Sequence, residues 1–170
     1  LLRFYGSLYL YFYAFLLGGL FVFFSATKDL YNVNTFIADF MADPTTVILL
    51  GRILSLSLCS ASGIIVYFIS RKFLNKIYSA IAVIIFTTST LIITCAHIAK
   101  LDSMNLFLFN LALILMLYAK NNKKVWMLSC VASGAVISCK LSSLSILVPL
   151  CYITVFQNNL QTLKHSYKQS

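Results

Sequence analysis

Long apolar stretches alternate with short polar turns along this chain. A helix of about 20 apolar residues rises about 30 Å, which is the thickness of the hydrocarbon core of a bilayer. The pattern therefore predicts an all-α, polytopic integral membrane protein with about five to six transmembrane helices. The uncharged or nearly uncharged stretches are Phe4–Thr27, Thr45–Ser70, Ile77–Ala96, Ser103–Ala119 and Val125–Leu163.

The first of these stretches is crowded with aromatic residues, which favour the membrane–water interface. The sequence leaves open whether it crosses the bilayer or lies at its surface. Pro44, one of only two prolines, follows the polar connector Lys28–Pro44 and marks the expected entry to the second stretch.

Composition agrees with a membrane protein. The chain has 170 residues, of which 61% are hydrophobic and only 10% are charged, too few for the surface of a soluble domain. The net charge of +9 comes from short cationic clusters beside apolar runs, which indicate membrane orientation and exclude a nucleic-acid partner. All five cysteines lie inside apolar stretches without CxxC spacing, so we interpret them as small buried hydrophobes.

The basic clusters predict a topology. Short loops rich in Lys and Arg stay in the cytoplasm, and the richest are Arg71–Lys76 and Lys120–Lys124. Two apolar stretches separate them, so the turn "HIAKLD" between those stretches faces the opposite, exoplasmic side. Asp102 lies in this turn, and the connector Lys28–Pro44 falls on the same side.

Four polar residues are candidates for ligand binding. Lys140 is the only charge between Val125 and Leu163, and charges inside a membrane tend to face a cavity, a partner charge or an anionic ligand. The Ser-rich segment "SCKLSSLS" around it fits a helix break or a wet pocket. Asp102, His97 and Arg52 are the others. Each also has an ordinary explanation: a solvated turn for Asp102 and His97, and an interfacial anchor for Arg52 and Lys140.

The segments "GRILSLSLCSASGIIVYFISRKF", "HIAKLDSMNLFLF" and "SGAVISCKLSSLSILVP" together resemble the membrane core of GT-C glycosyltransferases. They are most similar to the protein mannosyltransferase and aminoarabinose transferase group. Matching features, in order and spacing, are Arg52, the basic turn at Arg71–Lys72, Leu101–Asp102 and the helix from Gly134 to Lys140. The resemblance is strongest over residues 44–149, within a single domain spanning 1–170.

This resemblance implies an enzyme that transfers a sugar from a polyprenyl- or dolichyl-phosphate donor to an acceptor on the exoplasmic face. Lys140 would contact the lipid phosphate, together with Asp102, His97 and Arg52, and a divalent cation is a candidate cofactor. Asp102 has a support role at most, orienting the lysine, holding that cation or fixing the catalytic loop. The expected location is a bacterial inner or plasma membrane, with membrane lipids as partners.

Two departures from the group matter. His97 stands where an arginine is usual, five residues before the aspartate. The loop acid and Pro-Pro pair of the group are not visible, so we expect no catalytic residue in this chain and a base upstream of residue 1. The sugar, the acceptor and any metal stay open. A transporter or flippase, or a non-catalytic membrane subunit, are the alternatives, although the chain lacks the internal repeat typical of transporters.

Overall fold

The structure, a computed structural model, describes residues 7–27, 32–97, 101–119, 122–139 and 141–152. All regular secondary structure in these ranges is helical, which confirms the all-α class. The elements are α1 (Ser7–Thr27), α2 (Val33–Ala42), α3 (Thr45–Ser70), α4 (Lys76–Thr88), α5 (Thr90–His97), α6 (Leu101–Tyr118), α7 (Lys123–Cys139) and the 3₁₀ helix η2 (Leu141–Ile146).

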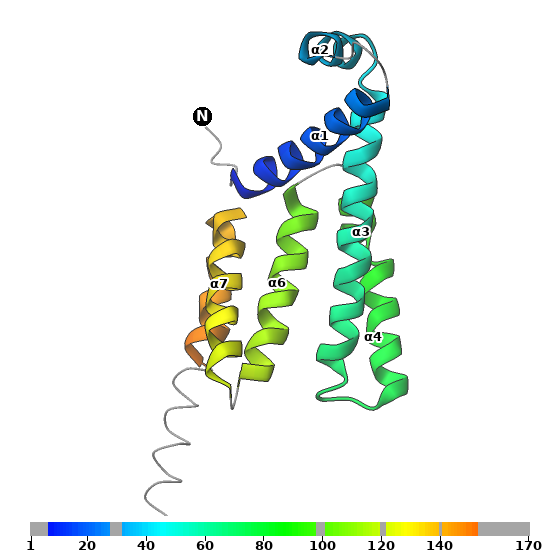
Figure 1. Ribbon diagram of the computed structural model, residues 1–170. Helices are drawn as coiled ribbons and strands as arrows, with labels where there is room; N and C mark the ends of the chain where they lie inside the picture. The colour runs from blue at the N-terminus through cyan, green and yellow to red at the C-terminus, as the bar shows by residue number, and fades with distance from the viewer. Residues whose placement is uncertain (1–6, 28–31, 98–100, 120–121, 140, 153–170) are drawn as a thin grey trace, which may run out of the picture.

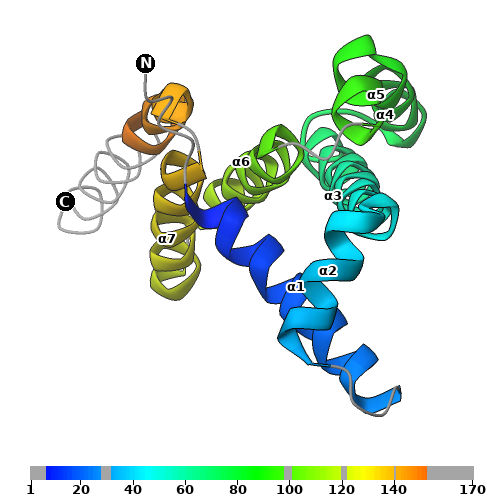
Figure 2. The same ribbon diagram turned by 90° about the horizontal axis from the view of Figure 1, so that it is seen from above.

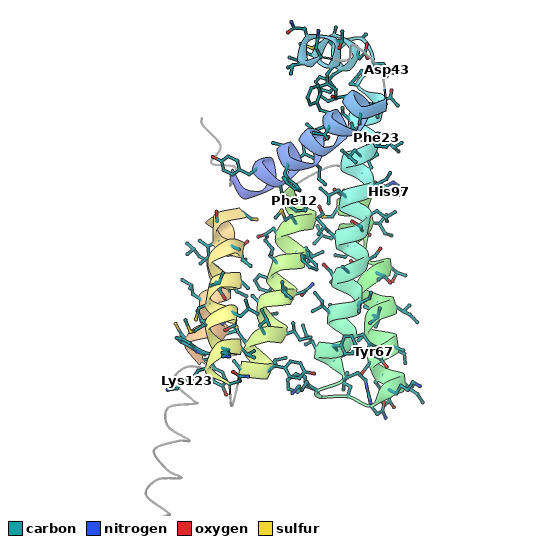
Figure 3. The ribbon with its side chains drawn as sticks, in the orientation of Figure 1. Phe12, Phe23, Asp43, Tyr67, His97 and Lys123 are labelled. Carbon is teal, nitrogen blue, oxygen red and sulfur yellow. The ribbon has the colours of Figure 1, made fainter. Side chains whose placement is uncertain are left out.

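The helices α3, α4, α6 and α7 stand side by side and form the bundle (Figure 1). α3 and α6 run in one direction, while α4 and α7 run back in the other. The turn between α3 and α4 and the turn between α6 and α7 therefore lie at one end. Asp43 and His97 lie toward the opposite end (Figure 3). This up-and-down arrangement places the two basic loops together, as the predicted topology requires.

Mostly small side chains line the buried faces of α3, which packs against α4, α5 and α6. The buried residues on α3 are Val47, Gly51, Ser55, Cys59, Ser62 and Gly63. The hydroxyl of Ser103 on α6 donates to that of Ser55 at 3.2 Å, and both side chains are completely buried. Small residues let helices approach closely where lipid removes the hydrophobic driving force.

Two apolar clusters complete the core. One joins α6, α7 and η2 through Ala112, Met116, Ala132, Val136 and Ile146. The other joins α3 to α5 through Cys59, Ile92 and Cys95. All five cysteines are free, and Cys59, Cys95 and Cys139 are buried, so the interpretation of these three as small buried hydrophobes is confirmed. Cys130 is half-buried and Cys151 is exposed.

The predicted span Ile77–Ala96 is built from two helices, α4 and α5, instead of one straight helix. The chain bends by 57° between α4 and α5, where Ser89 has an extended backbone. The hydroxyls of Thr87 and Thr88 donate to the carbonyls of Val83 and Ile84 at 2.9 Å and 2.7 Å. Such hydroxyls compete with the helical backbone bonds and bend helices, so the "TTST" run (87–90) explains the break.

The predicted number of spans stays a prediction. Within the described ranges, α3 is the one unbroken helix long and apolar enough to cross a bilayer, and the bent pair α4–α5 is a second if it counts as one span. The apolar segments found in the other helices of these ranges are 10–17 residues long, among them Tyr11–Ala26 within α1 and Asp102–Tyr118 within α6. α1 runs obliquely to the upright helices rather than along them (Figures 1 and 2).

Local hydrogen bonds set the corner between α1, α2 and α3. Asn32 caps α2 by a reciprocal capping box with Thr35. Asp43 accepts from the backbone N–H of Thr45 at 3.0 Å where α3 begins, and bonds from the hydroxyl and backbone of Thr45 hold the pKa of Asp43 below its usual value. The hydroxyl of Tyr13 donates to the carbonyl of Val47 at 2.7 Å, tying α1 to α3.

Candidate functional site

A pocket of about 260 Å³ lies between α5 and the first turns of α6. Its lining residues are Leu91, Ile92, Cys95, Asp102, Asn105, Leu106 and Phe109. The polar members, Asp102 and Asn105, belong to the start of α6, and the apolar members continue along α6 and α5. The pocket therefore has a polar end near the helix start and an apolar wall leading away from it.

Asp102 is half-buried in the first turn of α6. A carboxylate is stabilised there because the helix N-terminus carries a partial positive charge and unpaired N–H groups. The next residue, Ser103, ties this turn to α3 through its bond to Ser55. Asp102 therefore lines the α5–α6 pocket. Its membership of a ligand-binding site, and its role there, stay predictions.

Asn105 is a polar pocket residue that the sequence analysis did not single out. Its Oδ1 accepts a 3.0 Å hydrogen bond from the hydroxyl of Ser143, which is buried in η2. Asn105 and Asp102 are three residues apart on α6 and share a face. The spacing of three residues from Asp102 was the sequence signal that could have identified Asn105. Only the fold shows that the segment after α7 reaches Asn105.

Lys140 lies outside the described residues. Its flanks are described: α7 ends at the fully buried Cys139, and η2 begins at Leu141. The helix break expected at "SCKLSSLS" is therefore confirmed. Because Ser143 contacts Asn105, this break is joined to the pocket residues on α6 by a hydrogen bond.

His97 and Arg52 do not line the pocket between α5 and α6. His97 is the last residue of α5 and is exposed (Figure 3). Arg52 is exposed on α3, three residues before Ser55, and so about one turn closer to the pocket end. The structure gathers these two and Asp102 toward one end of the bundle without placing all three in one cavity.

A second pocket of about 310 Å³ lies at the same end, between α1, α2 and the start of α3. Phe24, Phe36 and Phe40 form much of its wall, and Asp39 and Asp43 supply its carboxylates. Asp43 already accepts the backbone N–H of Thr45 in the first turn of α3. No group of three or more His, Cys, Asp or Glu residues suited to a metal ion occurs in the part of the chain that the structure describes.

Comparison with known proteins identifies the family of the chain. A family model described as dolichyl-phosphate-mannose-protein mannosyltransferase matches residues 30–169. No curated protein and no solved structure matches the chain significantly. The matched region contains the α5–α6 pocket, Arg52 and the break at Lys140.

Proposed function

Because the chain belongs to the dolichyl-phosphate-mannose-protein mannosyltransferase family, whose members are integral membrane glycosyltransferases of the GT-C type, we propose that it serves sugar transfer from a polyprenyl-phosphate donor. In this proposal the acceptor is glycosylated on the exoplasmic side of a multi-pass protein in a bacterial inner or plasma membrane. The α5–α6 pocket is the part of the donor site that this chain supplies.

The shape and chemistry of the pocket carry the proposal. A polyprenyl-phosphate sugar has an apolar tail and an anionic, polar head. Leu91, Leu106 and Phe109 offer an apolar wall for isoprenoid carbons, whereas Asp102 and Asn105 are polar groups at the helix start. Ligand pockets commonly combine such an apolar lining with a few placed polar groups.

The reaction assigns distinct tasks to the charges. The bond from the anomeric carbon to the phosphate oxygen breaks, and a bond to the acceptor oxygen forms. The acceptor proton passes to a carboxylate base, and polyprenyl phosphate leaves with the electron pair. Cations stabilise the charge on the departing phosphate. We assign that task to Lys140 and Arg52, with His97 as a further cation when protonated.

Asp102 would repel a phosphate in direct contact, so its role is indirect. It orients a cation, holds a divalent ion with the donor phosphate, or supports the catalytic loop. The base itself is not assigned to this chain. A flippase would use the same lipid-phosphate contacts without cleaving the glycosidic bond, and a non-catalytic subunit would need neither.

Asp102→Asn in the full-length protein tests the proposal. Transfer of a labelled sugar from a polyprenyl-phosphate donor is measured in membranes. We expect kcat/KM to fall roughly 10- to 100-fold, as for loss of a hydrogen bond to a charged group. Asp43→Asn removes the same charge at the same end of the bundle and is the matched control, for which we expect near wild-type transfer.

Unchanged kcat/KM in Asp102→Asn would remove Asp102 from the site. Donor binding and movement across the bilayer without any sugar transfer by the wild-type protein would favour the flippase. Absence of both donor binding and transfer would favour the non-catalytic subunit.

A further inference from the structure

The first basic loop, Arg71–Lys76, contacts the end of α6, which directly precedes the second basic loop in the sequence. Nζ of Lys72, in the turn after α3, lies 4.0 Å from the centroid of the Tyr118 ring at the end of α6. A cation over an aromatic face is attracted by the ring quadrupole. The exposed cations that this arrangement gathers, called the basic end below, are Arg71, Lys72, Lys76, Lys123 and Lys124.

In the sequence, none of the acidic residues lies within or beside either basic loop. The four acidic residues are Asp29, Asp39, Asp43 and Asp102, and Asp43 lies at the far end of the bundle (Figure 3). The mutual repulsion of the cations is therefore not relieved by neighbouring carboxylates within either loop.

The helix starts add to the positive potential. α4 begins at Lys76 and α7 at Lys123, and neither has an acidic residue in its first turn. A helix N-terminus already carries a partial positive charge, so cations there are unfavourable unless an anion is near. Asn75 and Asn122 accept backbone N–H bonds at these starts, but they bring no negative charge.

Apolar side chains surround the basic end. Phe73, Ile77, Trp126 and Met127 are exposed beside the cations. Aromatic and apolar groups next to Lys and Arg are typical of the boundary between acyl chains and headgroups. The neighbouring chemistry is therefore that of a lipid surface.

We propose that the basic end is a binding site for anionic phospholipids, in which Lys72, held by Tyr118, and Lys123 contact headgroup phosphates between the two turns. This does not depend on the donor role of the pocket, which lies at the opposite end. It depends only on the chain residing in a membrane. A juxtamembrane cation near an anionic leaflet contributes about 1 kcal/mol, which corresponds to about fivefold in lipid preference.

The only tryptophan of the chain, Trp126, reports on this site. The chain is reconstituted into phosphatidylcholine vesicles that contain either brominated phosphatidylglycerol or brominated phosphatidylcholine with the same acyl chains. We expect the brominated phosphatidylglycerol to quench Trp126 more strongly at equal content. The preference should fall with added salt, because exposed charges are screened.

Variants locate the effect. Lys72→Gln and Lys123→Gln should each lower the preference about fivefold, whereas Lys100→Gln, an equal charge loss in the "HIAKLD" segment, should leave it unchanged. Tyr118→Phe keeps the ring under Lys72 and should retain the preference, whereas Tyr118→Leu should weaken it. Lys72, Lys123 and Tyr118 are exposed, and circular dichroism checks that the variants stay helical.

Equal quenching by the two brominated lipids would overturn the proposal. A phosphatidylglycerol preference that survives in the double variant Lys72→Gln/Lys123→Gln would overturn it as well. Loss of the preference when inorganic phosphate replaces chloride at matched ionic strength would show a site for free anions instead of lipid. Sugar transfer is not measured, so failure here leaves the proposed function untouched.

Discussion

The hydroxyl of Ser143 donates a 3.0 Å hydrogen bond to Oδ1 of Asn105, which joins the turn after α7 to the first turns of α6. Asn105 lines the pocket that also contains Asp102. The bond therefore links the segment that follows Lys140 to the polar end of the pocket. In the proposed enzyme, Asn105 and Ser143 are positioning residues for that segment.

Removing this bond should affect both stability and donor use. We expect Asn105→Ala and Ser143→Ala each to lower the free energy of unfolding by about 1 kcal/mol. A double-mutant cycle in detergent should show a coupling of about 0.6 kcal/mol or more. The donor KM should rise in both variants, while Ser145→Ala, exposed in the same 3₁₀ helix, serves as the control. Zero coupling would mean that the two side chains do not act together.

Asn110 offers a test of the packing of α6. The side chain is 92% buried, since its relative exposure is 8%, and its Nδ2 has no hydrogen-bond partner among the residues that the structure describes. An unpaired buried amide is destabilising. We expect Asn110→Leu to raise the free energy of unfolding by about 1 kcal/mol, whereas Asn105→Leu, which loses a made bond, should lower it. Equal losses in both variants would show that Asn110 is paired in the membrane.

Lys140 is the sharpest test of the donor site. An unpaired ammonium inside the hydrocarbon core costs about 3 kcal/mol on insertion scales. Because methionine is apolar, Lys140→Met should express and fold. If the lysine contacts the donor phosphate, kcat/KM should fall by a factor that corresponds to about 2–3 kcal/mol of lost transition-state stabilisation. Lys140→Arg should rescue only partly, because a planar fork differs from a point charge. Wild-type kcat/KM in Lys140→Met would identify a snorkelling anchor.

The predicted orientation can be measured by cysteine labelling. In a background without the five native cysteines, Leu74→Cys should be protected from an impermeant thiol reagent added outside intact cells. His97→Cys, exposed toward the opposite end of the bundle, should react. The expectation follows from the basic loops facing the cytoplasm. Labelling at 74 with protection at 97 would invert the topology and the side of the proposed chemistry.

Part of this fold was readable from the sequence. The stretch Thr45–Ser70 is the helix α3 with the same bounds, entered at Pro44. A helix break was one of two interpretations of "SCKLSSLS", and α7 does end at Cys139, before the 3₁₀ helix η2. These features depend on the local order of apolar, charged and helix-breaking residues, and such order determines helices and their ends without reference to the rest of the chain.

Only the tertiary structure decided which helices touch and through which residues. An apolar side chain suits lipid and protein interior equally, so hydropathy does not tell the face of a helix that packs. The pairs Ser55–Ser103, Asn105–Ser143 and Lys72–Tyr118 join residues 38 to 48 positions apart. The bend at Ser89 is explained by threonine hydroxyls that bond back to carbonyls of the preceding turn, which the structure reveals. In the sequence, small polar residues give little indication of which helices pack together. In the bundle, they form hydrogen bonds between helices.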